Sequence, residues 1–154
     1  MSQSLHDKLI SSIEAAGSLY FRLIVLAGPS GSGKTRVLQE LAKTLDTKVI
    51  NINLEVSSKL LELTQRQRAI KLSETLDQII LREKSPVIMD NIEILFDKTL
   101  KQNPLRLLQG MSRNKTILTS WNGHASGDKL VYAQPGHPEY QNYSLEGLVW
   151  VSME

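Results

Sequence analysis

The chain has 154 residues, 41% hydrophobic and 22% charged, a composition typical of one soluble globular domain. It contains no cysteine, which excludes disulfides, thiolate metal sites and a cysteine nucleophile. The net charge of +2 is too small to indicate a nucleic-acid partner by itself. The N-terminus does not resemble a signal peptide, and the longest apolar run, residues 23–27, is far shorter than the roughly 20 residues of a transmembrane helix. We therefore expect one domain over residues 1–154, no membrane segment and a cytoplasmic setting.

Apolar periodicity predicts alternating helices and strands in the first half of the chain. In chain order these are a helix over residues 5–16, a strand over 19–27, a helix over 33–45 and a strand over 48–53. A helical region follows over 57–83, and its polar middle, residues 64–68, marks a break between two helices.

In the second half, Pro86 ends the helical region, and a short buried strand over 87–90 follows it. Residues 96–109 read as a helix that Asn103 and Pro104 must kink or split. The remaining expected elements are a strand over 115–120, loops with a strand at 129–133 inside the Gly- and Pro-rich segment 122–147, and a last strand over 148–152. Such alternation predicts βαβ units and a mostly parallel five-stranded sheet covered on both faces.

Residues 28–35, GPSGSGKT, match the phosphate-loop motif G-x-x-x-x-G-K-[ST]. Glycines let successive backbone N–H groups point at phosphate oxygens, and the following helix directs its positive end at the same anion. A chance Gly/Ser turn is disfavoured because an apolar strand ends directly before the loop and an amphipathic helix begins inside it. The residues expected to contact nucleotide are Gly28, Pro29, Ser30, Gly31, Ser32, Gly33, Lys34, Thr35 and Arg36.

Two side chains of this loop have expected roles with ATP and Mg²⁺. Lys34 would reach the β- and γ-phosphates, and the Thr35 hydroxyl would bind the metal. Asp90 follows three apolar residues of a short strand, as the metal-linked Walker B aspartate does. Its alternative role is an ordinary helix cap. The long helical region between the two strands favours an inserted fourth strand, so we predict the order 5-1-4-3-2.

The group that activates water is less defined. Asn91 occupies the position where many P-loop proteins carry a glutamate, and an amide cannot accept a proton from water. Glu93 could turn back into the site or simply begin a helix, and Glu55, after the second strand, is a second candidate base.

Polar residues after the fourth strand could contact the γ-phosphate or its water. Asn122 and Thr119 are candidates for this sensor position, although Asn122 with Gly123 also fits a simple turn. No helical lid with a sensor arginine is expected, so Arg106 or Arg113 would have to act on a neighbouring subunit. Histidines in segment 122–147 lack the spacing of a metal site.

The motifs GPSGSGKT, INLE, VIMDNIEILF, TSWNG and YAQPGHPEY together resemble the BrxF family, small P-loop ATPase-like proteins of type 3 bacteriophage exclusion (BREX) systems. This resemblance covers essentially the whole chain. It implies an AAA+-like core, ATP binding, work beside other BREX proteins and a bacterial cytoplasmic location. Direct contact with DNA does not follow from it.

Three functions remain compatible with these residues. The first is a weak or partner-activated ATPase whose nucleotide state controls self-assembly or partner binding. The second is a small-molecule kinase, although segment 123–147 contains no arginine for a phosphate-covering lid. The third is a scaffold that needs nucleotide to fold and does not hydrolyse it, which Asn91 favours. The absence of the GTPase specificity motif N-K-x-D favours ATP over GTP.

Overall fold

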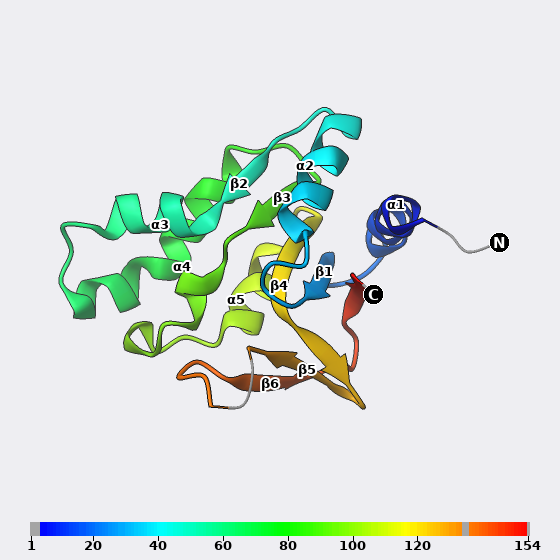
Figure 1. The fold of residues 1–154 in the computed structure, drawn as a ribbon. Helices are drawn as coiled ribbons and strands as arrows, with labels where there is room; N and C mark the ends of the chain where they lie inside the picture. The colour runs from blue at the N-terminus through cyan, green and yellow to red at the C-terminus, as the bar shows by residue number, and fades with distance from the viewer. Residues whose placement is uncertain (1–3, 134–135, 154) are drawn as a thin grey trace.

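The computed structural model describes residues 4–133 and 136–153 (Figure 1). The helices are α1 Leu5–Ala16, α2 Lys34–Thr44, α3 Ile52–Leu60, α4 Gln65–Leu81 and α5 Pro104–Met111, with short 3-10 helices η1 Glu93–Phe96 and η2 Lys98–Leu100. The strands are β1 Leu23–Gly28, β2 Val49–Asn51, β3 Val87–Asp90, β4 Ile117–Ser126, β5 Lys129–Tyr132, β6 Gln141–Ser144 and β7 Val149–Ser152.

Five strands form the central sheet in the order β2-β3-β4-β1-β7, and every neighbouring pair is parallel. With β7 as the fifth predicted strand, this is the predicted order 5-1-4-3-2. The inserted strand β4 lies between the phosphate-loop strand β1 and the strand β3 that ends at Asp90. This order places the C-terminal ends of β1 and β3 on either side of β4, which continues beyond them.

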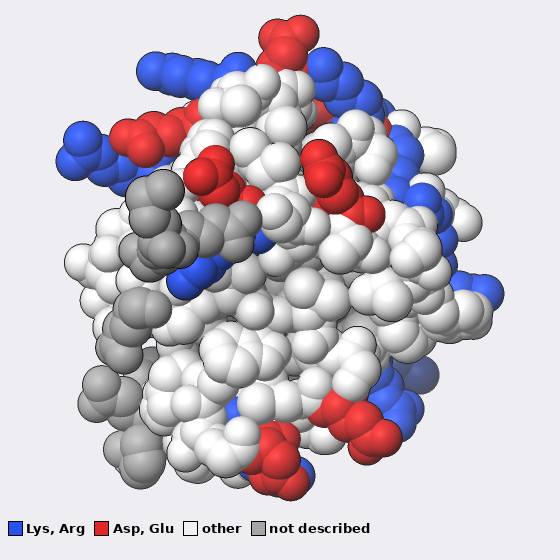
Figure 2. All heavy atoms as spheres, turned by 90° about the vertical axis from the view of Figure 1, so that its right-hand side faces the viewer, with Lys and Arg blue, Asp and Glu red and all other residues white. Residues whose placement is uncertain are grey.

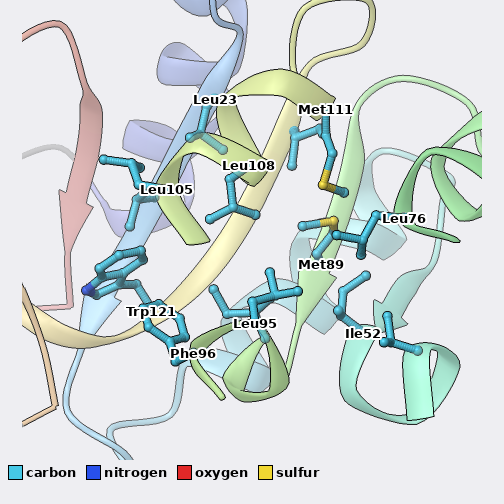
Figure 3. Close-up of a cluster of buried hydrophobic side chains, with 14 of the residues drawn as sticks. Leu23, Ile52, Leu76, Met89, Leu95, Phe96, Leu105, Leu108, Met111 and Trp121 are labelled. Carbon is cyan, nitrogen blue, oxygen red and sulfur yellow. The ribbon is translucent and has the colours of Figure 1, made fainter. Parts of the chain in front are cut away.

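Alternation along the strands divides the core between the two faces of the sheet. On one face, Leu23, Val25 and Met89 pack with buried side chains of α3, α4 and α5 (Figure 3). On the other face, Ile24 and Leu26 pack against α1 and α2. Every residue of β1 is buried, as expected for a strand covered on both sides.

Both predicted helical breaks are present, but the first begins before the predicted residues 64–68. Residues 61–64 separate α3 from α4, and Thr64 and Gln67 begin α4 with a reciprocal capping box. Asn103 caps α5 with Pro104 in its first turn, so residues 96–109 form short 3-10 turns and one helix. The second strand is shorter than predicted because the Asn51 side chain accepts a hydrogen bond from the Leu54 N–H and begins α3.

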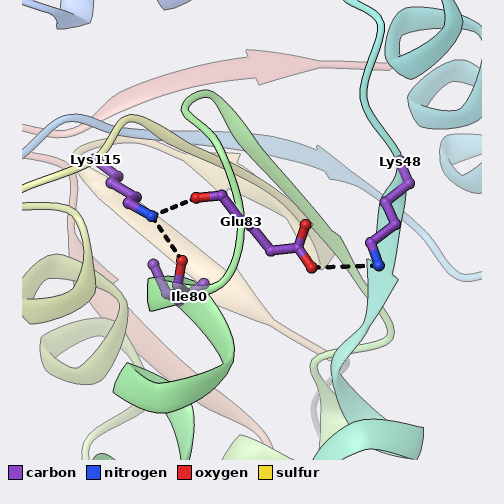
Figure 4. Close-up of polar contacts among 4 residues, drawn as sticks. All are labelled: Lys48, Ile80, Glu83 and Lys115. Carbon is purple, nitrogen blue, oxygen red and sulfur yellow. Dashed lines mark hydrogen bonds and ion pairs between the residues drawn. The ribbon is translucent and has the colours of Figure 1, made fainter.

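Lys115 fixes the end of α4 against the start of β4 (Figure 4). Its ammonium donates to the backbone carbonyls of Ile80 (2.9 Å), Leu81 (3.2 Å) and Glu83. The last carbonyls of a helix have no partner within the helix, and this cation satisfies them. The Glu83 carboxylate pairs in turn with Lys48 (3.3 Å), just before β2.

The fourth strand is longer than predicted because it continues into an antiparallel hairpin. Residues 123–126 of β4 pair with β5, and β5 pairs with β6, a strand that the sequence did not indicate. Gly123 permits this pairing, since a Cβ at that position would lie 1.7 Å from the Val131 carbonyl oxygen. Trp121 lies beneath the hairpin and donates from its indole nitrogen to the same oxygen (3.0 Å).

The side of the molecule with α1 and β7 carries its charged side chains toward the edges, with both signs interspersed (Figure 2). Uncharged residues form most of its centre. Among the described residues, no helix has the length and apolar character needed to cross a membrane.

Candidate nucleotide site

The phosphate loop connects the end of β1 to the first turn of α2. Gly31 (φ 82°) and Gly33 (φ 95°) both adopt the left-handed backbone region that favours glycine, and Gly33 is the N-cap of α2. A pocket of about 440 Å³ opens between this loop and the ends of β3 and β4. The Ser32 hydroxyl is buried and has no hydrogen-bond partner among the described residues. The loop therefore presents polar groups toward an anion-sized space at a helix N-terminus.

Lys34 is buried and lies inside this loop. Its ammonium donates to the carbonyl oxygens of Gly28 (2.6 Å) and Pro29 (2.7 Å). Burial lowers the pKa of Lys34, while the nearby carboxylates of Asp90 and Glu93 act in the opposite direction. Among the described residues, the hydrogen-bond partners of the ammonium are thus carbonyls of the loop, which phosphate oxygens could replace.

Asp90 connects α2 to the central strands. The Thr35 hydroxyl lies 2.5 Å from Asp90 Oδ2, and the Ser120 hydroxyl donates to Asp90 Oδ1 over 2.6 Å. Asp90 is 5% exposed, so both hydroxyls also satisfy a buried carboxylate. A hydroxyl and a carboxylate oxygen thus converge at the mouth of the phosphate loop, and both are ligand types that Mg²⁺ accepts.

Glu93 turns back toward the same pocket. The Asn122 amide donates to Glu93 Oε1 over 3.0 Å, and both residues line the pocket with Asp90. Asn91 also lines it, but its backbone has φ 55° and its carbonyl accepts a hydrogen bond from the Asn53 N–H (2.8 Å). This left-handed residue ends β3, and the 3-10 turn after it carries Glu93 to the pocket.

Several residues considered from the sequence lie elsewhere. Glu55 is exposed in the first turn of α3 and does not line the pocket. Thr119 is fully buried and donates to the Ser120 carbonyl (3.1 Å), so it faces the core. Arg36 lies at the rim of the pocket, where its exposed guanidinium pairs with Glu40 (3.4 Å).

The two arginines considered as fingers lie away from the chain's own phosphate loop. The Arg113 guanidinium stands 4.9 Å from the centre of the Tyr20 ring, near the start of β4. Arg106 lines a groove beside α4 and α5. Neither arginine is among the described residues that line the phosphate pocket of the chain.

Ser120 is the site residue that sequence reasoning missed. Strand alternation contains the signal for it, because Ser120 shares a sheet face with Leu118, while Thr119 shares the opposite face with Ile117 and Trp121. The α2 side of the sheet is the side that holds Asp90, so Ser120 rather than Thr119 reaches it. In the described part of the chain, no three His, Asp or Glu side chains gather into a metal site of their own.

Comparisons with known proteins agree with this geometry. Residues 24–128 match the family "ATPase family associated with various cellular activities (AAA)", which covers more than half of the chain. No curated protein matches the chain in sequence. Among solved structures, PCH-2 of C. elegans has the same fold with a TM-score of 0.52 and 22% identity. That match covers 83% of this chain and 40% of PCH-2. The fold, the phosphate loop and the family match agree, and the chain belongs to the AAA family of ATPases.

Proposed function

We propose that the chain is an ATP-binding switch, a weak or partner-activated ATPase whose nucleotide state controls self-assembly or partner binding. The observation that carries this proposal is the pairing of Glu93 with Asn122 beside Asp90 and Thr35. A carboxylate at this point can accept a proton from a water molecule that attacks the terminal phosphate.

Each side chain of the site has its own role in the proposed hydrolysis. The loop amides and Lys34 bind the phosphates and offset their negative charge, and Thr35 and Asp90 would hold Mg²⁺. Mg²⁺, when bound, neutralises charge on the β- and γ-phosphates. Glu93 orients the attacking water and takes its proton as the bond between the terminal phosphorus and the bridging oxygen breaks.

Two features favour slow hydrolysis by the chain alone. The first is that Asn91, at the position where many P-loop proteins carry a glutamate, cannot act as a base. The second is that, of the described residues that line the pocket, Arg36 is the only arginine, and it pairs with Glu40. A cation from a neighbouring subunit or partner would then complete the site, which supports nucleotide-dependent self-assembly.

The wider role we propose is in bacterial antiphage defence of the BREX type, in the cytoplasm and beside other BREX proteins. The resemblance of DNIEILF and PGHPEY to the BrxF family supports this role. ATP rather than GTP is proposed because no N-K-x-D motif is present.

The test measures phosphate release and oligomeric state with and without Mg-ATP. We expect slow release, and a shift in molecular mass by light scattering when Mg-ATP is added. Asp90→Asn should lose both responses, while Lys43→Met, on the exposed last turn of α2, should keep them. The proposal is wrong if the unaltered chain releases no phosphate from Mg-ATP and its molecular mass stays the same when Mg-ATP is added.

A further inference from the structure

A second cavity, of about 720 Å³, adjoins the phosphate pocket on the side of the hairpin. The two spaces share Ser30, Glu93 and Asn122 as lining residues. The outer wall comes from the base of the β4–β5 hairpin, at Gly123, His124 and Tyr132, and from His137 and Glu139 after β5. Cavities of this size accommodate small organic molecules. A ligand there would lie beside the phosphate loop without occupying it.

The charge of the lining indicates which ligands the cavity favours. Glu93 and Glu139 both line it, and its lining contains no lysine and no arginine within the described residues. Neither glutamate forms an ion pair among the described residues. A carboxylate offers about four acceptor sites, and the Asn122 amide uses one of those on Glu93. The cavity therefore has negative charge and spare hydrogen-bond acceptors.

Tyr132 lines the cavity together with Glu93 and Glu139, and its hydroxyl is affected by both carboxylates. Burial raises the pKa of the Tyr132 hydroxyl, and the charges of Glu93 and Glu139 raise it further. Its ring is held from below, stacked on Phe96 at 3.4 Å between centroids, with Trp121 packed edge-on against both rings. The floor of the cavity is therefore rigid, and two acidic groups face the volume above it.

We propose that this cavity binds a small organic cation, a molecule that carries an amine or guanidine group. Such a group donates several hydrogen bonds and would place a positive charge beside both Glu93 and Glu139, in addition to the Lys34 charge that already acts near Glu93. Side chains at the rim, His124 and His137, contribute further polar contacts. The cation would share Glu93 with the proposed ATP site, but Lys34, Thr35 and Asp90 do not line this cavity.

The histidines make the proposal directly measurable. The chain has three histidines, and the one that does not line the cavity, His6, lies in α1. We would titrate the protein with agmatine at about pH 8, without nucleotide, and follow the imidazole Cε1 protons by NMR. The signals of His124 and His137 should shift and saturate together, while that of His6 should stay in place. Pentanediol, a neutral molecule of similar length, and glutarate, an anion, should leave all three signals unchanged.

A pair of variants tests the charge argument. Glu139→Gln should weaken agmatine binding about tenfold, because it removes one charged acceptor. Glu146→Gln, an exposed position outside the cavity lining, should bind as the unaltered chain does. The proposal is overturned if agmatine moves neither cavity histidine, if pentanediol or glutarate moves them equally, or if Glu139→Gln binds with unchanged affinity. Because no nucleotide is present, these outcomes do not depend on whether the chain binds or hydrolyses ATP.

Discussion

The phosphate loop and the hairpin contribute to the site in different ways. The loop and Lys34 belong to one continuous strand–loop–helix segment, so its local sequence suffices to predict its shape. Asn122 meets Glu93 from 29 residues further along the chain, at the point where β4 leaves its pairing with β1 and continues into the hairpin over a layer of aromatic rings. Binding groups thus come from a local motif, whereas the proposed water-activating pair depends on tertiary packing.

Removal of Trp121 should have the largest effect on stability, because this side chain joins the hairpin to the core. It is fully buried and hydrogen-bonded to Val131. Trp121→Ala should lower the free energy of unfolding by about 3–5 kcal/mol, measured by chemical denaturation. Trp150→Ala is the control, since Trp150 is 39% exposed, and it should cost far less. Equal losses in the two variants would contradict the role of the aromatic layer.

Gly123→Ala should disturb the hairpin and leave the phosphate loop and α2 intact. The new Cβ would overlap the Val131 carbonyl, so β4 and β5 must move apart at a cost of about 1–3 kcal/mol. Hydrogen exchange should accelerate in β5 while α2 stays protected. Gly110→Ala, in α5 with open space around it, should be neutral or stabilising. Unchanged exchange in β5 would show that the hairpin does not need this close approach.

Lys115→Met tests a smaller contribution to stability, at the end of β4 opposite the hairpin. It removes the donor from the carbonyls at the end of α4 and should destabilise the fold by about 1–2 kcal/mol. The matched variant is Lys48→Met, which breaks only the surface pair with Glu83 and should cost under about 0.5 kcal/mol. Thermal unfolding of both variants gives the comparison, and equal effects would rule out the capping role.

Alkaline pH should loosen the hairpin by a small amount. Burial raises the pKa of Tyr143 from 10.0 to about 12. A raised pKa means that the folded state holds this proton more tightly, so stability is complete below pH 10 and falls as pH rises toward 12. Tyr143→Phe should show a shallower decline over this interval, measured as the unfolding free energy against pH. Identical slopes would show that Tyr143 does not titrate with folding.

The sequence predicted the parts of the fold that rest on local patterns. Strand order followed from Asp90 and the long helical region before it, and the α4 and α5 boundaries followed from Thr64 and Pro104. β6 escaped prediction because its residues are mostly exposed and polar, and its pairing with β5 supplies the strand geometry. Ser120 escaped because only the neighbouring strands and helices decide which face of β4 meets Asp90. Glu55 was wrongly considered because β2 ends at Asn51, two residues before the predicted end of the second strand, and α3 then carries Glu55 away from the pocket.

The central claim is that Glu93, held by Asn122, serves cleavage and not binding. The most direct test measures phosphate release from Mg-ATP and ATP affinity for Glu93→Gln, with Glu55→Gln as the matched control on exposed α3. We expect Glu93→Gln to release phosphate about 100-fold more slowly with ATP affinity nearly unchanged, and Glu55→Gln to resemble the unaltered chain. Phosphate release by Glu93→Gln at the rate of the unaltered chain would contradict the claim.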